Sequence, residues 1–227
     1  MGRRRIFVGI DGCSKGWVAL RMNTRGVMDA GLFQDFSALM DAHRDAEVLG
    51  VDMPLGLCER GPRAADGAAR AFLKGRASSV FNAPIRPVLS ADTHAEATAL
   101  SVRLTGKGLS QQSFNLLRKI REVDAFSHDP RLFEVHPEVS FQLMAGAPLH
   151  AAKKTWGGLQ RRLALLATQG MVVPAMFEGA AHIGIDDVVD AAGAAWSARR
   201  IAQGKARPFP ETTERTADGR RRIAIWG

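Results

Sequence analysis

The hydrophobic and polar positions of the first 54 residues predict three adjacent strands, a helix and a fourth strand. A continuous apolar run over residues 4–11 is typical of a strand buried on both faces. The alternating segments WVALRMN and VMDAGLF, separated by a turn at residues 23–26, predict an antiparallel meander with that strand. The segment DFSALMDAHRD then predicts a helix capped by Asp35, and VLGVDMP predicts a fourth strand that Pro54 ends.

The pattern changes over residues 54–129, where Gly and Pro interrupt short helical segments rich in Arg and Lys. This region is predicted to be a mostly helical, basic insertion. The segment RLFEVHP predicts a fifth strand. Helical patterns follow at residues 138–145, at 156–169, and from near Asp186 to about Gly204. The tail, residues 205–227, has an Asp-Gly turn between two short runs and predicts a hairpin, which leaves an added sheet edge and a homodimer contact both open.

Four acidic residues fall where strands end or on the last helix. Asp11 ends the first apolar run, Asp52 ends the fourth strand, and Asp187 and Asp190 are three residues apart, so that they share a helix face. Parallel neighbouring strands would bring Asp11 and Asp52 to the same spot. Carboxylates so placed repel one another unless a hard cation such as Mg²⁺ or Mn²⁺ neutralises them, which predicts metal-assisted phosphoryl chemistry.

The alternative for each acid is a structural role, because an isolated aspartate at a strand end is commonly a turn or cap residue. Asp186 is expected to be such a residue, as the N-cap of the last helix. Asp190 differs, because its neighbours in VVDAAGAAW are small and apolar, and a carboxylate there is costly without a partner.

The composition indicates a single domain and favours a polyanionic binding partner. The chain has 227 residues, 46% of them hydrophobic, and a formal net charge of +8. Such a charge favours nucleic acid as a partner, although it also suits an ordinary soluble surface. Cys13 and Cys58 are expected to be reduced thiols, and the absence of a long apolar stretch predicts a cytoplasmic protein without a membrane span.

Several motifs resemble a known family. They are GIDGCSKGWV, VDMPLGL, GLSQQSFNLLRKIREVD, FEVHPEVSFQLMAG and DDVVDAAGAAWSARRIAQG, and together they resemble the domain of unknown function 429 family, a predicted nuclease group. The order of elements resembles the RNase H fold, and the spacing of Asp187 and Asp190 resembles the final helix of RuvC-like resolvases. The resemblance implies a single RNase H-like α/β domain over residues 1–227. Its mixed five-stranded sheet, three antiparallel strands followed by parallel ones, would be flanked by helices.

The resemblance also implies a two-metal nuclease, with two Mg²⁺ or Mn²⁺ ions about 4 Å apart on the scissile phosphate. Asp11 would bridge both ions, and Asp52 and one of the last-helix acids, Asp187 or Asp190, would hold one each. Glu134 on the fifth strand would be a further ligand or would organise the water. His136, two residues on, would face the same side and relay a proton, or be an ordinary half-buried histidine. Glu138 is expected to start the following helix.

Basic residues are the expected nucleic-acid contacts: Lys15, Arg76, Arg86, Lys153 and Lys154. Lys15 lies in the turn after the first strand, where a solvated lysine is also usual. The segment GRASSVFNAPIRPVL carries Ser78, Phe81 and Asn82 and could grip a backbone and stack a base, or could be a packed connection.

Two other functions compete with a nuclease. The GIDxG start of the chain also suits an ATP-binding phosphotransferase of the actin and sugar-kinase type, but that group needs two such domains and this chain has room for one. A catalytically silent nucleic-acid-binding protein would keep the fold without turnover.

Overall fold

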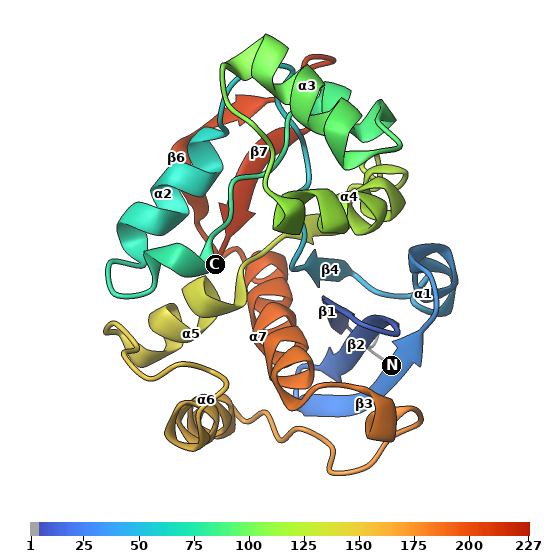
Figure 1. The fold of residues 1–227 in the computed structure, drawn as a ribbon. Coiled ribbons are helices and arrows are strands. Elements are labelled where there is room, and N and C mark those ends of the chain that lie inside the picture. The colour runs from blue at the N-terminus through green and yellow to red at the C-terminus, as the bar shows by residue number, and fades with distance from the viewer. Residues whose placement is uncertain (1–4) are drawn as a thin grey trace.

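A five-stranded mixed sheet lies between two layers of helices in the computed structural model, which describes residues 5–227 (Figure 1). Its strands are β1 (Ile6–Cys13), β2 (Gly16–Asn23), β3 (Gly26–Phe33), β4 (Val48–Val51) and β5 (Leu132–Glu134). The order in the sheet is β3-β2-β1-β4-β5, with β1, β2 and β3 antiparallel neighbours and β4 and β5 parallel to β1. The predicted mixed sheet is confirmed, and Arg4, at which its first strand was expected to begin, lies outside the described residues.

Helices cover both faces of the sheet. They are α1 (Phe36–Ala42), α2 (Ala64–Phe72), α3 (His94–Thr105), α4 (Gln111–Asp124), α5 (Pro137–Ala145), α6 (Trp156–Thr168) and α7 (Ile185–Ala202), with short 3₁₀ turns η1 (Ala77–Ser79), η2 (Arg86–Ser90) and η3 (Ala180–His182). As predicted, α1 is capped by Asp35, which accepts a hydrogen bond from Ala38 N at 2.8 Å. Residues 54–129 contain helices and 3₁₀ turns but no strand, which agrees with the predicted helical character of this region.

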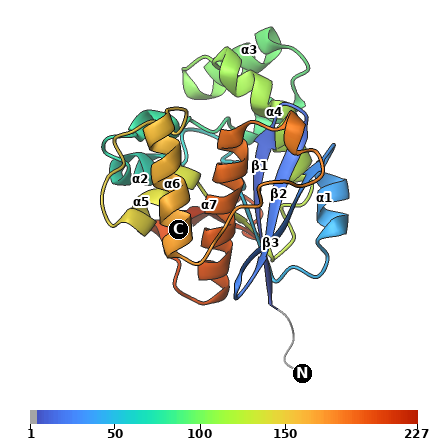
Figure 2. The ribbon, with the colours of Figure 1, turned by 90° about the horizontal axis from the view of Figure 1, so that it is seen from below.

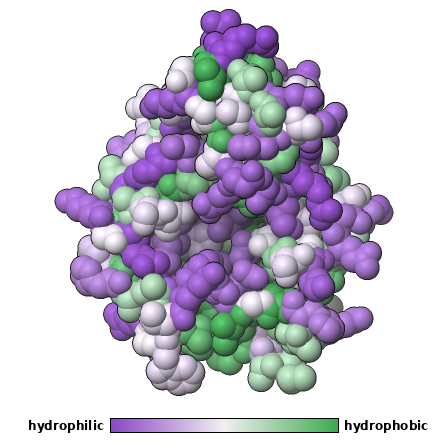
Figure 3. Space-filling view, in the orientation of Figure 1, coloured by the Kyte–Doolittle hydropathy of each residue, from purple (hydrophilic) through white to green (hydrophobic). Residues whose placement is uncertain are grey.

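The alternation of side chains along β1 divides the core in two. Ile6, Val8 and Ile10 pack against α1, α3 and α4 on one face of the sheet, whereas Phe7 packs against α5, α6 and α7 on the other. Figure 2 shows α7 and α1 on opposite sides of the strands. Most apolar side chains are therefore inside, and Figure 3 shows a largely hydrophilic surface with apolar atoms gathered toward its lower edge.

Helix α7 lies directly against the sheet because two strand glycines leave room for its backbone. A Cβ atom on Gly9 would lie 2.0 Å from Ala191 O and from Ala195 N, and one on Gly50 would lie 2.9 Å from Ala194 O. Almost every residue of α7 from Val188 to Ala198 is buried as a result. This close approach fixes where the acidic residues of α7 lie relative to β1 and β4.

Two predicted strand ends are corrected. β1 continues past Asp11 to Cys13, because its antiparallel pairing with β2 extends into the tight turn, so Asp11 lies within the strand. β5 ends at Glu134, three residues earlier than predicted, because Pro137 lacks an N–H and begins α5. His136 is consequently the N-cap of α5 and not a strand residue, so strand alternation does not align it with Glu134.

The predicted cap of the last helix is also wrong. Gly184 is the N-cap of α7, since Val188 N donates to Gly184 O at 3.3 Å and opens the helical ladder. Asp186 lies in the first turn, where its negative charge is favourable.

The tail forms the predicted hairpin, β6 (Pro208–Arg215) and β7 (Arg222–Trp226), beside α2 (Figure 1). A single parallel bridge joins Trp226 to Val135, just beyond β5. The hairpin is a two-stranded sheet of its own that touches the β5 side of the main sheet through this one bridge, and the predicted homodimer contact stays a prediction. No helix within residues 5–227 is long and apolar enough to cross a membrane.

Candidate functional site

Aspartates from three different elements converge at one corner of the sheet. Ile10 of β1 is paired with Val51 of β4, and Asp52 N continues this ladder by donating to Ile10 O at 2.9 Å, so Asp11 and Asp52 are neighbours across the two strands. Each lies two residues beyond a glycine that faces α7, and side chains two apart on a strand share a face. Both carboxylates consequently point toward α7.

Helix α7 supplies the other two acids. Asp190 precedes Ala191, whose carbonyl oxygen lies against Gly9, and Asp187 is on the same helix face one turn earlier. Figure 2 shows the end of β1 and the first turns of α7 at the same end of the sheet. We call Asp11, Asp52, Asp187 and Asp190 the acidic cluster.

The electrostatics of the acidic cluster show mutual repulsion. Burial raises the pKa of Asp11 well above its usual range, and the charges of Asp52, Asp190 and Asp187 raise it further. Burial also raises the pKa of Asp52 and of Asp190 to about 7, against the opposing effect of Lys153. The pKa of Asp187 is raised by burial and then by neighbouring Asp186. These carboxylates are thus near enough to interact and are short of positive charge.

Lys153 provides an ammonium group that bonds directly to one of these acids. Its Nζ donates a hydrogen bond to Asp190 and lies 3.9 Å from Asp186. Burial lowers the pKa of Lys153, but the carboxylates of Asp190, Asp11 and Asp52 outweigh burial and raise it overall. The nucleic-acid contact predicted for Lys153 stays a prediction, and in this structure Lys153 contacts Asp190.

The carboxylate oxygens are only partly satisfied. Asp190 Oδ1 is buried without a hydrogen-bond partner, and Asp11 Oδ1 accepts one bond, from Gly12 N at 2.8 Å. Even so, no group of three or more His, Cys, Asp or Glu side chains in residues 5–227 is placed to hold a metal ion. The acids lie at one corner of the sheet, where the ammonium of Lys153 pairs with Asp190. Their side chains are not arranged as a metal site in this structure.

Glu134, predicted to join these acids, is not brought to them. It is opposite Val51 in the ladder, so its side chain points to the face of the sheet away from α7. Both of its oxygens accept hydrogen bonds from Arg63, each at 2.7 Å, and one also accepts from Leu55 N at 2.6 Å. Arg63 also bonds Asp66, which makes a buried ion-pair triad with Glu134. The Glu134 carboxylate is thus neutralised by Arg63 on the opposite face of the sheet from the acidic cluster.

His136 does lie near the acidic cluster. It is half-buried, its Nε2 is 3.3 Å from Ser79 O, and its Nδ1 has no hydrogen-bond partner. Burial lowers its pKa, although the negative charges of Asp190 and Glu138 oppose that effect. A neutral imidazole therefore borders the acids at neutral pH.

Glu138 is a neighbour that the sequence did not reveal. It lies in the first turn of α5, as predicted, but it is also buried and raises the pKa of both Asp52 and Asp190. Its carboxylate accepts two hydrogen bonds from buried Arg162, at 2.8 and 2.7 Å, and lies 3.7 Å from Arg76. Nothing in the sequence marks it, since a glutamate in a first helical turn is ordinary.

The predicted nucleic-acid contacts divide into two groups. Arg76, beside Glu138, and Lys154, 3.7 Å from Asp186, border the acidic cluster together with Lys153. Arg86 is engaged elsewhere, since it pairs with Asp124 at 2.7 Å. Lys15 is exposed in the β1–β2 turn.

Lys119 of α4 is a further cation near the acidic cluster, and it is not among the predicted contact residues. Its Nζ donates to Gly16 O at 2.5 Å and lies 4.4 Å from the centre of the Trp17 ring. Its side chain also runs beside Gly12, since a Cβ there would lie 2.9 Å from Lys119 Cδ. Lys119 is therefore a further positive side chain near Asp11, and the charge of Asp11 favours its ammonium form.

One comparison with known proteins gives a match. The model of the family described as protein of unknown function (DUF429) matches residues 9–215, a span that includes the second half of β1, the acidic cluster and the first strand of the hairpin. No curated protein and no solved structure matches the chain.

Proposed function

The chain belongs to the DUF429 family, and we propose that it is a metal-dependent nuclease that hydrolyses phosphodiester bonds. The observation that carries this proposal is the convergence of Asp11, Asp52 and Asp190 from β1, β4 and α7, where burial and mutual repulsion raise their pKa values. A protein that keeps uncompensated carboxylates together at an energetic cost is commonly using them.

The fold is proposed to be RNase H-like. Three features support this: the strand order β3-β2-β1-β4-β5, the parallel pairing of β1 with β4, and acids on β1, after β4 and on the last long helix. Fold likeness alone would not assign an activity. The activity is therefore proposed from the acidic residues and not from the fold.

The donor set suits a divalent metal ion in its chemistry. Oxygen-only ligands favour Mg²⁺ or Mn²⁺, and the unpartnered buried Oδ1 of Asp190 lacks the neutralising contact that such an ion would provide. Asp11, Asp52 and Asp190 would hold the metal, with Asp187 beside them. When bound, divalent ions lower the pKa of an attacking water and stabilise charge on the phosphate. The side chains must first rearrange, because Lys153 pairs with Asp190 in this structure.

The basic residues of this corner have roles of their own in the proposal. Once the carboxylates are neutralised, Lys153 is released from Asp190 to pair with a phosphate oxygen. Arg76 and Lys154 lie on the same rim and orient the rest of the backbone. His136 is near enough to Asp190 for the two charges to interact, and its Nδ1 has no hydrogen-bond partner, which leaves it free for the proposed proton relay.

A cleavage assay tests the nuclease. Labelled single-stranded, duplex, hybrid and junction substrates are incubated with Mg²⁺ or Mn²⁺ and with wild-type protein, Asp11→Asn or Asp41→Asn. Asp41, an exposed α1 residue paired with exposed Arg44, is the matched control. Loss of metal contacts worth several kcal/mol predicts a rate about 10²- to 10⁴-fold lower for Asp11→Asn and unchanged for Asp41→Asn. Equal rates for wild type and Asp11→Asn would reject the proposal.

One observation favours a second function. The ammonium of Lys153 already occupies Asp190, and no described group of acids holds metal geometry. A nucleic-acid-binding protein without turnover would suit that arrangement. Salt-sensitive binding of all four substrates without any cleavage in either metal would support this alternative.

A further inference from the structure

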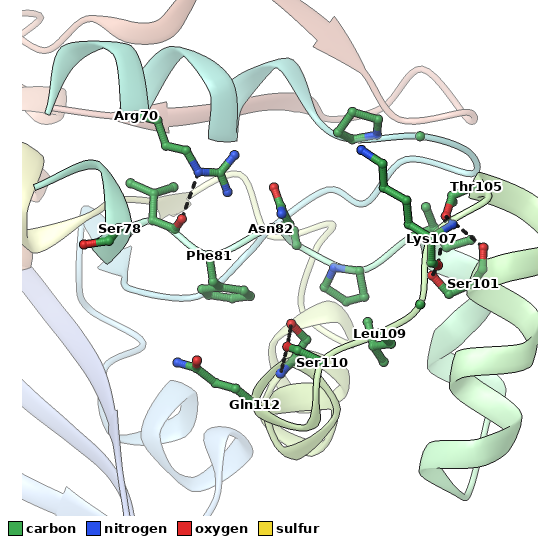
Figure 4. A pocket seen from close by; sticks show the side chains of 18 of the residues that line it. Arg70, Ser78, Phe81, Asn82, Ser101, Thr105, Lys107, Leu109, Ser110 and Gln112 are labelled. Carbon is green, nitrogen blue, oxygen red and sulfur yellow. Dashed lines mark hydrogen bonds between the residues drawn. The ribbon is translucent and has the colours of Figure 1, made fainter. Parts of the chain in front are cut away.

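A cavity of about 740 Å³ opens beside the acidic cluster without including any of its residues. Its walls are the loop before α2, the segment that follows η1, and the connection between α3 and α4 (Figure 4). The figure shows Phe81 and Asn82 on one side of the space and Gln112 on the other, with Arg70 above and Lys107 beside them.

The cavity is positively charged. Its lining includes Arg70 and Lys107 and contains no Asp or Glu. The Nε of Arg70 donates to Val80 O at 3.0 Å, which leaves the other guanidinium nitrogens free, and neither cation forms an ion pair with any residue of the described chain. Two uncompensated cations without a nearby acid favour an anionic ligand.

The remaining lining suits a nucleobase. Phe81 is half-buried and forms no ring contact with another aromatic side chain among residues 5–227. The exposed amides of Asn82 and Gln112 lie on either side of it and make no hydrogen bond within the described chain. A free aromatic face, free amide groups and cations are the combination that stacks a base, reads its edge and holds its phosphate.

The walls of the cavity are held in place before any ligand arrives. Ala83 N donates to Asp66 Oδ2 at 3.0 Å, and Asp66 belongs to the buried triad with Arg63 and Glu134. On the opposite wall, the Lys107 carbonyl accepts a hydrogen bond from Ser101 Oγ at 2.7 Å. The cavity walls are therefore ordered by folding, so less conformational entropy is lost when a ligand binds.

One short stretch of chain joins the cavity to the acidic cluster. Arg76 lies 3.7 Å from Glu138, and Ser79 O is 3.3 Å from His136 Nε2, both at the acidic corner. The same stretch continues directly into Phe81 and Asn82 in the cavity wall. A polymer with a phosphate at the acidic corner can therefore follow this stretch into the cavity.

We infer that the cavity binds a single-stranded segment of nucleic acid, with one base stacked on Phe81 and a backbone phosphate between Arg70 and Lys107. This inference rests on the proposed function in taking nucleic acid as the substrate, and it specifies that the strand is unpaired next to the cleavage point. A duplex would not fit, because the base that stacks on Phe81 must leave its partner.

Binding is measured by fluorescence anisotropy with labelled oligothymidylate and oligouridylate of about a dozen nucleotides, in EDTA so that no cleavage occurs. Loss of one stacked base predicts that Phe81→Ala raises the Kd about 5- to 100-fold. Phe177→Ala is the matched control, a half-buried phenylalanine in the segment that passes β3, and its Kd should equal that of wild type. The two probes decide between DNA and RNA as the source of the strand.

The lysine gives a second test that does not depend on the core. Lys107→Gln should reduce the slope of log binding constant against log salt by about 0.7, whereas Lys205→Gln, another exposed lysine, should leave it unchanged. This holds even if Phe81→Ala fails to fold, which thermal melting reports. Unchanged binding by folded Phe81→Ala together with an unchanged slope for Lys107→Gln would overturn the inference.

Two further outcomes separate this inference from the nuclease. Binding that depends on Phe81, without cleavage by wild type in Mg²⁺ or Mn²⁺, would support the cavity and reject the nuclease. Cleavage by the wild type, together with binding by Phe81→Ala that equals that of wild type, would support the nuclease and count against the cavity. Thymidine or uridine monophosphate bound as tightly as the oligonucleotide would also overturn the inference, since the cavity would then take a free nucleotide.

Discussion

Replacing Asp52 by asparagine is expected to stabilise the metal-free protein at about pH 8, although the residue is in the proposed active site. Burial, opposed by Lys153 and assisted by Glu138, raises the pKa of Asp52 from its ordinary 3.8 to about 7. The folded protein therefore binds the proton of the Asp52 carboxyl more tightly than the unfolded chain does. The resulting cost to stability is absent below about pH 3.8 and complete above about pH 7.

The magnitude follows from that difference. The rise in the pKa of Asp52 from 3.8 to about 7 corresponds to at most about 4 kcal/mol of lost stability at pH 8. Asparagine keeps part of the cost of burying a polar group, and the charges of neighbouring acids relax once one is removed. We therefore expect Asp52→Asn to raise the free energy of unfolding by about 1–2 kcal/mol at pH 8 and by nearly nothing near pH 4.

Urea denaturation in EDTA at both pH values measures the effect, with Asp41→Asn as the control for loss of one exposed charge. A gain at pH 8 that vanishes near pH 4 supports a repulsive acidic cluster. A loss of stability at pH 8, or an equal change at both pH values, would refute the reasoning, because Asp52 would then be compensated in the folded protein.

Three further substitutions have defined outcomes. Glu134→Gln should cost about 3–5 kcal/mol in urea denaturation, because it breaks a buried ion pair, and a stable variant that has lost cleavage would instead restore its predicted catalytic role. Gly9→Ala should cost on the order of 3 kcal/mol or prevent folding, since its Cβ meets the backbone of α7, whereas Gly67→Ala, with open space on α2, should be neutral or stabilising in the same assay. Lys153→Met should tighten Mn²⁺ binding about tenfold in calorimetric titration, because the competing ammonium is gone; weaker binding would contradict the competition.

The sequence predicted most of the sheet because its signals are local. Apolar runs and the turn at residues 23–26 predict β1, β2 and β3, and Asp35 marks the start of α1. The convergence of Asp11 and Asp52 followed from placing β4 beside β1, and the structure has that pairing. Asp190 was recognisable because a charged residue among small apolar neighbours needs a partner.

The contacts that the sequence did not predict depend on information that a local pattern does not contain. Glu134 reads as a strand-end acid like the others, but a one-residue difference in register puts it on the opposite face of the sheet, beside Arg63. The pairing of Lys153 with Asp190 joins residues 37 positions apart, and no spacing rule predicts it. The cavity at Phe81 likewise depends on how α3 and α4 pack above that segment.

Calorimetric titration of Mn²⁺ into the wild type, Asp190→Asn and Asp41→Asn proteins tests the central claim most directly, namely that the acidic cluster is a divalent-metal site. We expect binding by the wild type and by Asp41→Asn, and binding at least about tenfold weaker for Asp190→Asn, because a buried ligand has been removed. The same affinity for all three proteins, or no binding by the wild type, would contradict it.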